Sequence, residues 1–373
     1  MTSTSVLENY GIDLESGFLP CSPPLQVLPE LYAPWEEMAS SLSGLLNAHA
    51  FRSAVETMPL ITDLTPLKTN AELERAMLLL SCFGHGFVWE NYESSGYVPP
   101  CIAVPWTKVA ERLSRPPTLA HASLVLQNWR LLDPDGPVAL GNIATLIQFH
   151  GGLDEAWFYL VTTEIESTGA RILKEFDTIS AALAASDLDK VAASLVSACD
   201  VLGQLRETLN RMHDYCDPYI FYNRIRPFLA SFEGIEYQGC DPLLRDYFGG
   251  SAAQSSLLQA IDAMFGIVHH DDNARGYLHE MRNYMPRGHA AYIEHLESSP
   301  PLVQSTRSHN GCRRALVACI EALAEFRKDH LKMVGRYVMA QSSHAGPGHT
   351  GTGGTDPMPF LRQVTRGTRV PGT

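Results

Sequence analysis

The chain has 373 residues, more than the roughly 250–300 at which a single hydrophobic core stops growing, so we expect two domains. Hydrophobic residues make up 45% of the sequence and can supply both cores. The formal charge is −13, from 28 basic and 41 acidic residues, and this acidic balance argues against partners such as nucleic acid or an anionic membrane.

The eight cysteines are scattered and form no CxxC pair, which excludes a zinc ribbon and a thioredoxin motif. A disulfide framework is not expected in a chain of this length, so we predict reduced thiols and a cytoplasmic location. The N-terminal residues lack a basic stretch followed by an apolar run, and no run of eighteen apolar residues is present. We therefore expect neither a signal peptide nor a membrane span.

The first part of the chain shows mainly helical periodicity. Five prolines between residues 20 and 34 predict an extended arm. Thr69 or Asn70 can cap the strongest helix of this part. The segment from 94 to 106 is rich in proline and is predicted to be a loop. Helices are predicted over residues 35–57, 70–92, 107–113 and 119–132.

A domain boundary is predicted near residue 148. It would divide the chain into a small, mainly helical N-terminal domain (1–148) and a large helical C-terminal domain (149–373). Gly151-Gly152 breaks the chain, and Asp154 is a plausible N-cap for the next helix. Another long helical pattern covers 179–213, interrupted near Ser186-Asp187. Runs with strand periodicity are scarce, so the fold is predicted to be mostly α.

Residues 313–340 predict one long helix with a single imidazole on its apolar face. His330 shares that face with six apolar side chains spaced by three and four residues: Leu316, Ile320, Leu323, Phe326, Val334 and Tyr337. Such a histidine is either a core residue with satisfied hydrogen bonds or an axial ligand of haem iron. The helix alone leaves both interpretations open.

Three other stretches contain polar residues that are candidates for binding a ligand or a metal ion. Arg226, in FYNRIRPF, is either half-buried against a carboxylate of the protein or binds that of a ligand, where a bidentate pair would contribute about 1.5–3 kcal/mol. GGSAAQSS (249–256) and GTGGTD (351–356) are either flexible loops or places where the backbone approaches a ligand closely. The run HHDD (269–272) is predicted to be a solvated turn, because adjacent side chains diverge and rarely share one metal ion.

Taken together and in this order, the segments of the chain resemble the indoleamine 2,3-dioxygenase family of haem enzymes. The resemblance covers nearly the whole chain and is densest after residue 221. It implies a large helical domain that binds haem and a smaller N-terminal domain that covers the distal side of the haem. The segments that carry it are NYGIDLESGFLP, IAVPW, NWRLLDP, FYNRIRPFL, GGSAAQSS, MRNYMP, LESSP, FRKDHL and GTGGTD.

The resemblance assigns roles to individual residues. His330 becomes the proximal ligand of haem b iron, and Arg327 pairs with Asp262 beside it. The catalytic candidates are Arg226, which would bind the substrate carboxylate, and Thr162, which would lie above the iron. The further substrate-binding residues that it implies are Phe158, Phe221, Tyr222, Gly250, Ser251, Ala252 and Thr352.

Two positions depart from the family's mammalian members. Thr162 stands where they carry serine, so an added methyl group narrows the pocket. Tyr222 stands where they carry phenylalanine, and its hydroxyl needs a partner if it is buried. Both departures bear on substrate preference.

The activity implied by the resemblance is cleavage of the indole C2–C3 bond of L-tryptophan by O2. The product is N-formylkynurenine, in the first step of the kynurenine pathway, and an electron donor keeps the haem reduced. Two alternatives stay open: a haem oxygenase of the same fold that acts on another indole or inserts one oxygen atom, and a non-enzymatic haem sensor. Arg226 and GTGGTD argue against the sensor, because a sensor has no need to bind a carboxylate.

Overall fold

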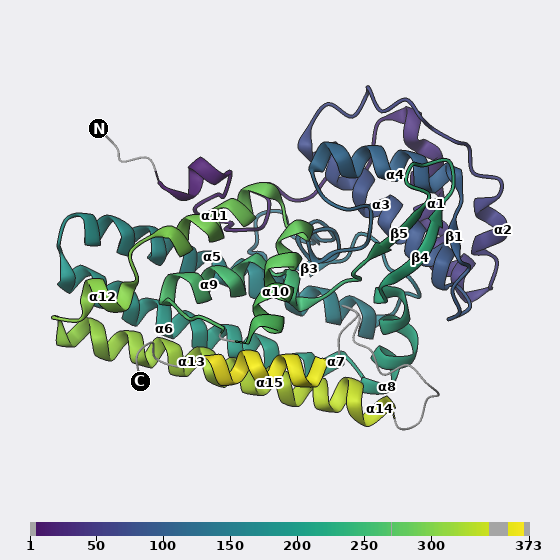
Figure 1. Ribbon diagram of the computed structural model, residues 1–373. Helices are drawn as coiled ribbons and strands as arrows, with labels where there is room; N and C mark the ends of the chain where they lie inside the picture. The colour runs from purple at the N-terminus through teal and green to yellow at the C-terminus, as the bar shows by residue number, and fades with distance from the viewer. Residues whose placement is uncertain (1–4, 270, 343–356, 369–373) are drawn as a thin grey trace.

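A computed structural model of the chain describes residues 5–269, 271–342 and 357–368, and its fold is mostly α, as predicted (Figure 1). The α-helices are α1 (Ala33–Asn47), α2 (Phe51–Val55), α3 (Asn70–Trp89), α4 (Pro100–Leu113), α5 (Leu153–Ala184), α6 (Leu188–Asn210), α7 (Met212–Tyr215), α8 (Pro218–Ile220), α9 (Ser256–Phe265), α10 (Asp272–Met281), α11 (Arg287–Ser298), α12 (Leu302–Thr306), α13 (Asn310–Val334), α14 (Ala340–Ser342) and α15 (Pro357–Gly367). The strands are β1 (Tyr97–Val98), β2 (Arg130–Leu131), β3 (Ile143–Ala144), β4 (Phe232–Tyr237) and β5 (Leu244–Tyr247).

Three long helices, α5, α6 and α13, pack side by side and form one half of the molecule (Figure 1). The break predicted near Ser186-Asp187 separates α5 from α6. Ser186 adopts a left-handed conformation with φ 57°, and the Asp187 carboxylate accepts a hydrogen bond from the Lys190 amide at 3.0 Å, which caps α6. The chain therefore reverses here, and the apolar faces of α5 and α6 meet.

Helix α3 is the central helix of the other half of the molecule. It begins at the predicted cap: the Glu72 amide donates to Thr69 Oγ1 at 3.2 Å, and the Thr69 amide donates to the Glu72 carboxylate at 2.7 Å. Nearly all of its residues after the first turn are buried. This helix therefore forms the wall on which the surrounding elements pack.

A small sheet joins segments that are distant in sequence. Strand β1 pairs in parallel with β4, and β4 pairs antiparallel with β5. In Figure 1, β4 and β5 lie beside α3 and α4, although they follow α5 and α6 in the chain. Residues 232–247 therefore return to the elements of the first 148 residues. The division of the chain into domains at residue 148 stays a prediction.

Two predicted helices of the first part have different bounds. The helix expected over 35–57 is two helices, α1 and α2, separated by His49 with φ 52°. The helix expected over 107–113 begins earlier, at Pro100, in the stretch interpreted as a loop. Proline fits the first helical position because the amide it lacks would have no partner there.

The helix predicted over 119–132 was wrong. The segment forms only one π-helical turn, η3 (Ala122–Leu126), and then strand β2. The Asn128 side-chain oxygen accepts from the amides of Leu146 and Ile147 at 3.1 and 2.9 Å. This side chain joins two loops, and its contacts are to a distant segment that local periodicity does not reveal.

Two further observations concern the described residues as a set. All eight cysteines lie within the described residues and are free. None of the described helices combines the length and the apolar character that crossing a bilayer requires.

Candidate active site

A cavity of about 260 Å³ lies between α5, α13 and the segments around residues 226 and 251. Eight of the predicted site residues line it, and they come from four separate parts of the sequence: Phe158, Thr162, Phe221, Arg226, Gly250, Ser251, Ala252 and His330. The structure therefore gathers the residues that the resemblance assigned to one site.

His330 faces this cavity from α13. The residue is half-buried, and its ring has no hydrogen-bond partner among the described residues. Burial, together with the nearby charge of Arg327, lowers the pKa of His330 to about 4. The imidazole is therefore neutral at physiological pH, which is the form that can bind a metal ion.

Helix α5 supplies the wall with Phe158 and Thr162, one turn apart. The Thr162 hydroxyl donates to the Phe158 carbonyl at 3.1 Å, so its proton is used within the helix and its oxygen keeps acceptor lone pairs. The Phe158 ring packs against Phe221, with centroids 4.7 Å apart. This wall is therefore mainly aromatic, with one hydroxyl.

Arg226 begins a short 3₁₀ helix, η5 (Arg226–Leu229), directly after the π-helical turn η4 (Phe221–Ile225). Its guanidinium carbon lies 5.2 Å from the centroid of the Tyr222 ring, which fixes the side chain through a cation–π contact. Burial lowers the pKa of Arg226, yet a guanidinium remains charged at neutral pH. Tyr222 is buried beside Arg226 and is not part of the cavity lining.

The segment from Gly249 to Ser255 forms another part of the lining. A Cβ atom on Gly249 would lie 2.0 Å from the Leu229 carbonyl oxygen, so only glycine lets the two backbones approach. The Ser251 hydroxyl accepts from the Ala253 amide at 3.2 Å, and the Gln254 amide group donates to the Gly249 carbonyl at 3.0 Å. These bonds fix the conformation of the loop itself, and the close approach of Gly249 to Leu229 places the loop against the segment that carries Arg226.

The expected pair of Asp262 and Arg327 is present behind His330. Arg327 Nη2 donates to Asp262 Oδ2 at 2.6 Å, and Nη1 donates to the Thr368 hydroxyl after α15. Burial alone would raise the pKa of Asp262, but the charge of Arg327 and the hydrogen bond from His269 outweigh burial and lower it. The carboxylate therefore stays ionised and neutralises Arg327.

A buried polar group that the sequence analysis missed also lines the cavity. Glu166, one turn after Thr162 on α5, accepts from His121 Nε2 and from the Ser255 hydroxyl, each at 2.8 Å. The helical spacing from Thr162 could have indicated Glu166. His121 carries no comparable signal, because it reaches the cavity from a segment that was predicted wrongly.

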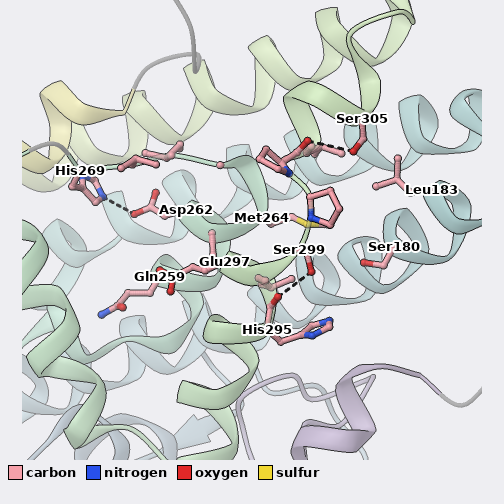
Figure 2. A pocket seen from close by; sticks show the side chains of 18 of the residues that line it. Ser180, Leu183, Gln259, Asp262, Met264, His269, His295, Glu297, Ser299 and Ser305 are labelled. Carbon is pink, nitrogen blue, oxygen red and sulfur yellow. Dashed lines mark hydrogen bonds and ion pairs between the residues drawn. The ribbon is translucent and has the colours of Figure 1, made fainter.

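A larger cavity of about 830 Å³ lies between the end of α5 and helices α9 to α12 (Figure 2). It is not our candidate site, because its buried charged groups already have partners: Arg282 pairs with Glu297 at 2.5 Å, and Asp262 accepts a hydrogen bond from His269 at 3.0 Å. Neither His330 nor Arg226 lines it. The smaller cavity holds the groups that can perform chemistry.

The solvated turn predicted over 269–272 was wrong for His269. Its side chain is buried and donates through Nε2 to the Asp262 carboxylate, as Figure 2 shows. The Asp271 carboxylate caps α10 by accepting from the Ala274 amide at 2.9 Å. His270 lies outside the described residues, as do Thr352 and the GTGGTD segment.

The composition of the smaller cavity fits a haem group. Within the described ranges, no cluster of three or more His, Cys, Asp or Glu side chains could hold a bare metal ion. On α13, His330 offers a neutral imidazole among apolar side chains, and such a ligand suits a metal that brings its own equatorial ligands, as haem iron does. His330 would hold that iron, and Phe158, Phe326 and Val334 would contact the porphyrin or its substrate.

Comparison with known proteins gives a consistent result. The family model described as indoleamine 2,3-dioxygenase matches residues 6–371. Human indoleamine 2,3-dioxygenase 2 is 37% identical over 96% of this chain and 93% of its own length. Indoleamine 2,3-dioxygenase of Saccharomyces cerevisiae is 32% identical over 97% and 93%. A protein named myoglobin, from Haliotis madaka, is 29% identical over 96% of both chains.

Proposed function

Because the chain belongs to the indoleamine 2,3-dioxygenase family, it is a haem-dependent dioxygenase of indoles, and we propose that its substrate is L-tryptophan. In this proposal, O2 is added across the indole C2–C3 bond and the product is N-formylkynurenine. A separate electron donor keeps the haem reduced.

The observation that carries the proposal is that Arg226 and His330 line one apolar cavity. A neutral imidazole supplies the ligand for the iron, and a guanidinium supplies two parallel donors for a carboxylate. Phe158 and Phe221, whose rings pack against each other, supply aromatic surface in the same cavity. An amino acid with a flat aromatic side chain matches this combination.

The residues of the chain act by positioning the substrate and by excluding water. Haem b, when bound, supplies the iron that activates O2. Arg226 fixes one end of the substrate, and the aromatic wall holds the indole ring, so the reacting groups meet in an ordered arrangement. The Thr162 hydroxyl donates its proton to the Phe158 carbonyl, so its oxygen acts as a hydrogen-bond acceptor that orders water or substrate at the cavity wall.

Reversible O2 binding without turnover is a second candidate function. The relative named myoglobin favours it, since that protein matches over almost the entire chain. A monooxygenase that inserts a single oxygen atom is a third outcome that the same experiment can detect.

The test is a reaction with labelled oxygen. The full chain is reconstituted with haemin, reduced, mixed with L-tryptophan under ¹⁸O2 and analysed by mass spectrometry. Two labelled atoms in N-formylkynurenine support the proposal. One labelled atom would assign a monooxygenase, and an oxygenated spectrum without product would assign an oxygen carrier. His330→Ala serves as the control for haem-independent oxidation.

A further inference from the structure

His269 is a buried histidine that the proposed reaction does not use. It lies in the short segment between α9 and α10. Gly266 ends α9 in a left-handed conformation with φ 68°, and the Ile267 amide donates back to the Asp262 carbonyl at 2.9 Å. The chain therefore folds over the last turn of α9 and brings His269 next to Asp262.

His269 and Arg327 share one oxygen of Asp262. His269 Nε2 donates to Oδ2 at 3.0 Å, and Arg327 Nη2 donates to the same atom at 2.6 Å. Oδ1 of Asp262 is buried and has no partner among the described residues. The three residues are each less than 10% exposed, so water screens the ion pair of Asp262 and Arg327 weakly.

This cluster lies directly behind the candidate iron ligand. Arg327 is one turn before His330 on α13, and Asp262, Arg327 and His330 line a common small cavity of about 60 Å³. Carboxylates next to a metal-bound imidazole increase its basicity and so favour the oxidised metal. A donor on such a carboxylate withdraws part of its negative charge.

We propose that His269 is a positioning residue for the haem: by donating to Asp262, it limits the negative charge near His330 and raises the reduction potential of the iron. This inference rests on the proposed role of His330 as the proximal ligand. His269 does not contact the reacting atoms, and its influence passes through Asp262.

The experiment compares four proteins reconstituted with haemin: wild type, His269→Leu, His269→Gln and His279→Leu. Leucine removes the donor, whereas glutamine keeps an N–H group of similar reach. His279 is the matched control, because it is an exposed histidine that lines the same larger cavity as His269. The measurements are the ferric–ferrous midpoint potential and the iron–imidazole stretching frequency in the resonance Raman spectrum.

We expect His269→Leu to raise the ferric-to-ferrous ratio at a fixed applied potential by roughly tenfold, because the carboxylate of Asp262 then keeps more of its negative charge and favours the oxidised iron. This corresponds to a fall in midpoint potential of about 59 mV for one electron. The iron–imidazole frequency should rise. His269→Gln should lie close to wild type, and His279→Leu should match it.

Two results would overturn the inference. One is an unchanged potential and frequency in His269→Leu; the other is an equal shift in His279→Leu. A His330→Ala protein separates this failure from failure of the proposed function. If His330→Ala keeps the iron–imidazole band, the assignment of His330 as the ligand is wrong, and the proposed role of His269 is wrong as well. If the band is lost but His269→Leu is unchanged, only the role of His269 is wrong.

Discussion

Two histidines on apolar helices, His85 in α3 and His330 in α13, have opposite surroundings. His85 is fully buried, and its Nδ1–H donates to the Phe228 carbonyl at 2.8 Å while Nε2 accepts from the Leu119 amide at 3.1 Å. His330 faces a cavity and has no such partner among the described residues. Burial lowers the pKa of both rings, to about 3 for His85 and about 4 for His330.

The comparison shows that the charge state of a histidine does not reveal its role, whereas its partners do. Both rings are neutral at pH 7. His85 uses both nitrogens to join α3 to the segments around residues 119 and 228, so it is structural. His330 keeps its nitrogens available at a cavity, so it can bind iron. The predictions below test this difference, beginning with the largest effect.

Replacing His330 by Ala should abolish stoichiometric haem binding and tryptophan turnover, because no other imidazole can take its place on α13. The loss of haem affinity and activity should exceed the roughly 10–100-fold loss that follows removal of a residue that only hydrogen-bonds a metal ligand. The free energy of unfolding of the apo protein should change by less than about 1 kcal/mol, since few contacts are removed. Haem titration and urea denaturation measure the two effects, and retained activity would refute the assignment.

Replacing His85 by Ala should give the reverse pattern. The substitution leaves a buried amide and a buried carbonyl unpaired and opens a cavity, so stability should fall by about 3–5 kcal/mol. Urea denaturation of the apo protein measures this loss. Any folded fraction should still bind haem through His330. A loss of haem affinity without a loss of stability would contradict the assignment of His85 as a structural residue that has no part in haem binding.

Replacing Arg226 by Ala should raise the KM for L-tryptophan by about 10–100-fold, equivalent to about 1.5–3 kcal/mol of a charged hydrogen-bonded pair. The KM for an indole without a carboxylate should change little, which makes that compound the control. Steady-state kinetics with both substrates provides the measurement. An unchanged KM for tryptophan would remove the proposed role of Arg226.

Acidification should destabilise the protein through its buried neutral histidines. In the folded state, burial lowers the pKa of His85 to about 3, against an ordinary value of 6.5. The pKa of His289 is also about 3, lowered by burial and by the charges of Arg115 and His121. Unfolding therefore takes up protons below pH 6.5, and stability falls from there towards pH 3, by about 2 kcal/mol per histidine at pH 5.

Urea denaturation at pH 7 and pH 5 measures this dependence. His85→Gln should remove the contribution of His85 to the pH dependence of stability and leave the contribution of His289. In the apo protein His330 adds a contribution of nearly the same size at pH 5, because its pKa of about 4 also lies below that pH. A pH dependence that is identical in His85→Gln would contradict the assignment of His85 as a neutral core residue.

Replacing Thr162 by Ser should have the smallest effect. It removes one methyl group from the cavity wall and keeps the hydroxyl, so the relative kcat/KM of bulkier indoles should improve by about 2–10-fold, close to 1 kcal/mol. Competition between tryptophan and a ring-substituted tryptophan gives this ratio. A large fall in kcat for both substrates would instead assign Thr162 a direct part in the chemistry.

Long helices with one clear apolar face were predictable from the sequence. The cap at Thr69, the break near Ser186 and the helix that carries His330 all depend on residues close together in the chain. The mostly α fold was predicted for the same reason. Local rules are sufficient where the pattern of apolar side chains repeats over several turns.

The segments that contact distant parts of the chain were not predictable. Asn128 ends a helical pattern because its side chain bonds residues near 147, and His269 is buried because α9 turns back on Asp262. His121 and Glu166 meet only in the folded protein. In each case the partner is far away in sequence or lies on another element, so no local pattern identifies it.

The sequence by itself determined the long helices with one apolar face, the family resemblance and the identity of the residues that could bind haem and a carboxylate. Only the tertiary structure decided that His330 and Arg226 face one cavity, while His85 is enclosed by its own hydrogen bonds. The physical reason is that side-chain chemistry is local, whereas burial and partnership depend on which surfaces pack together.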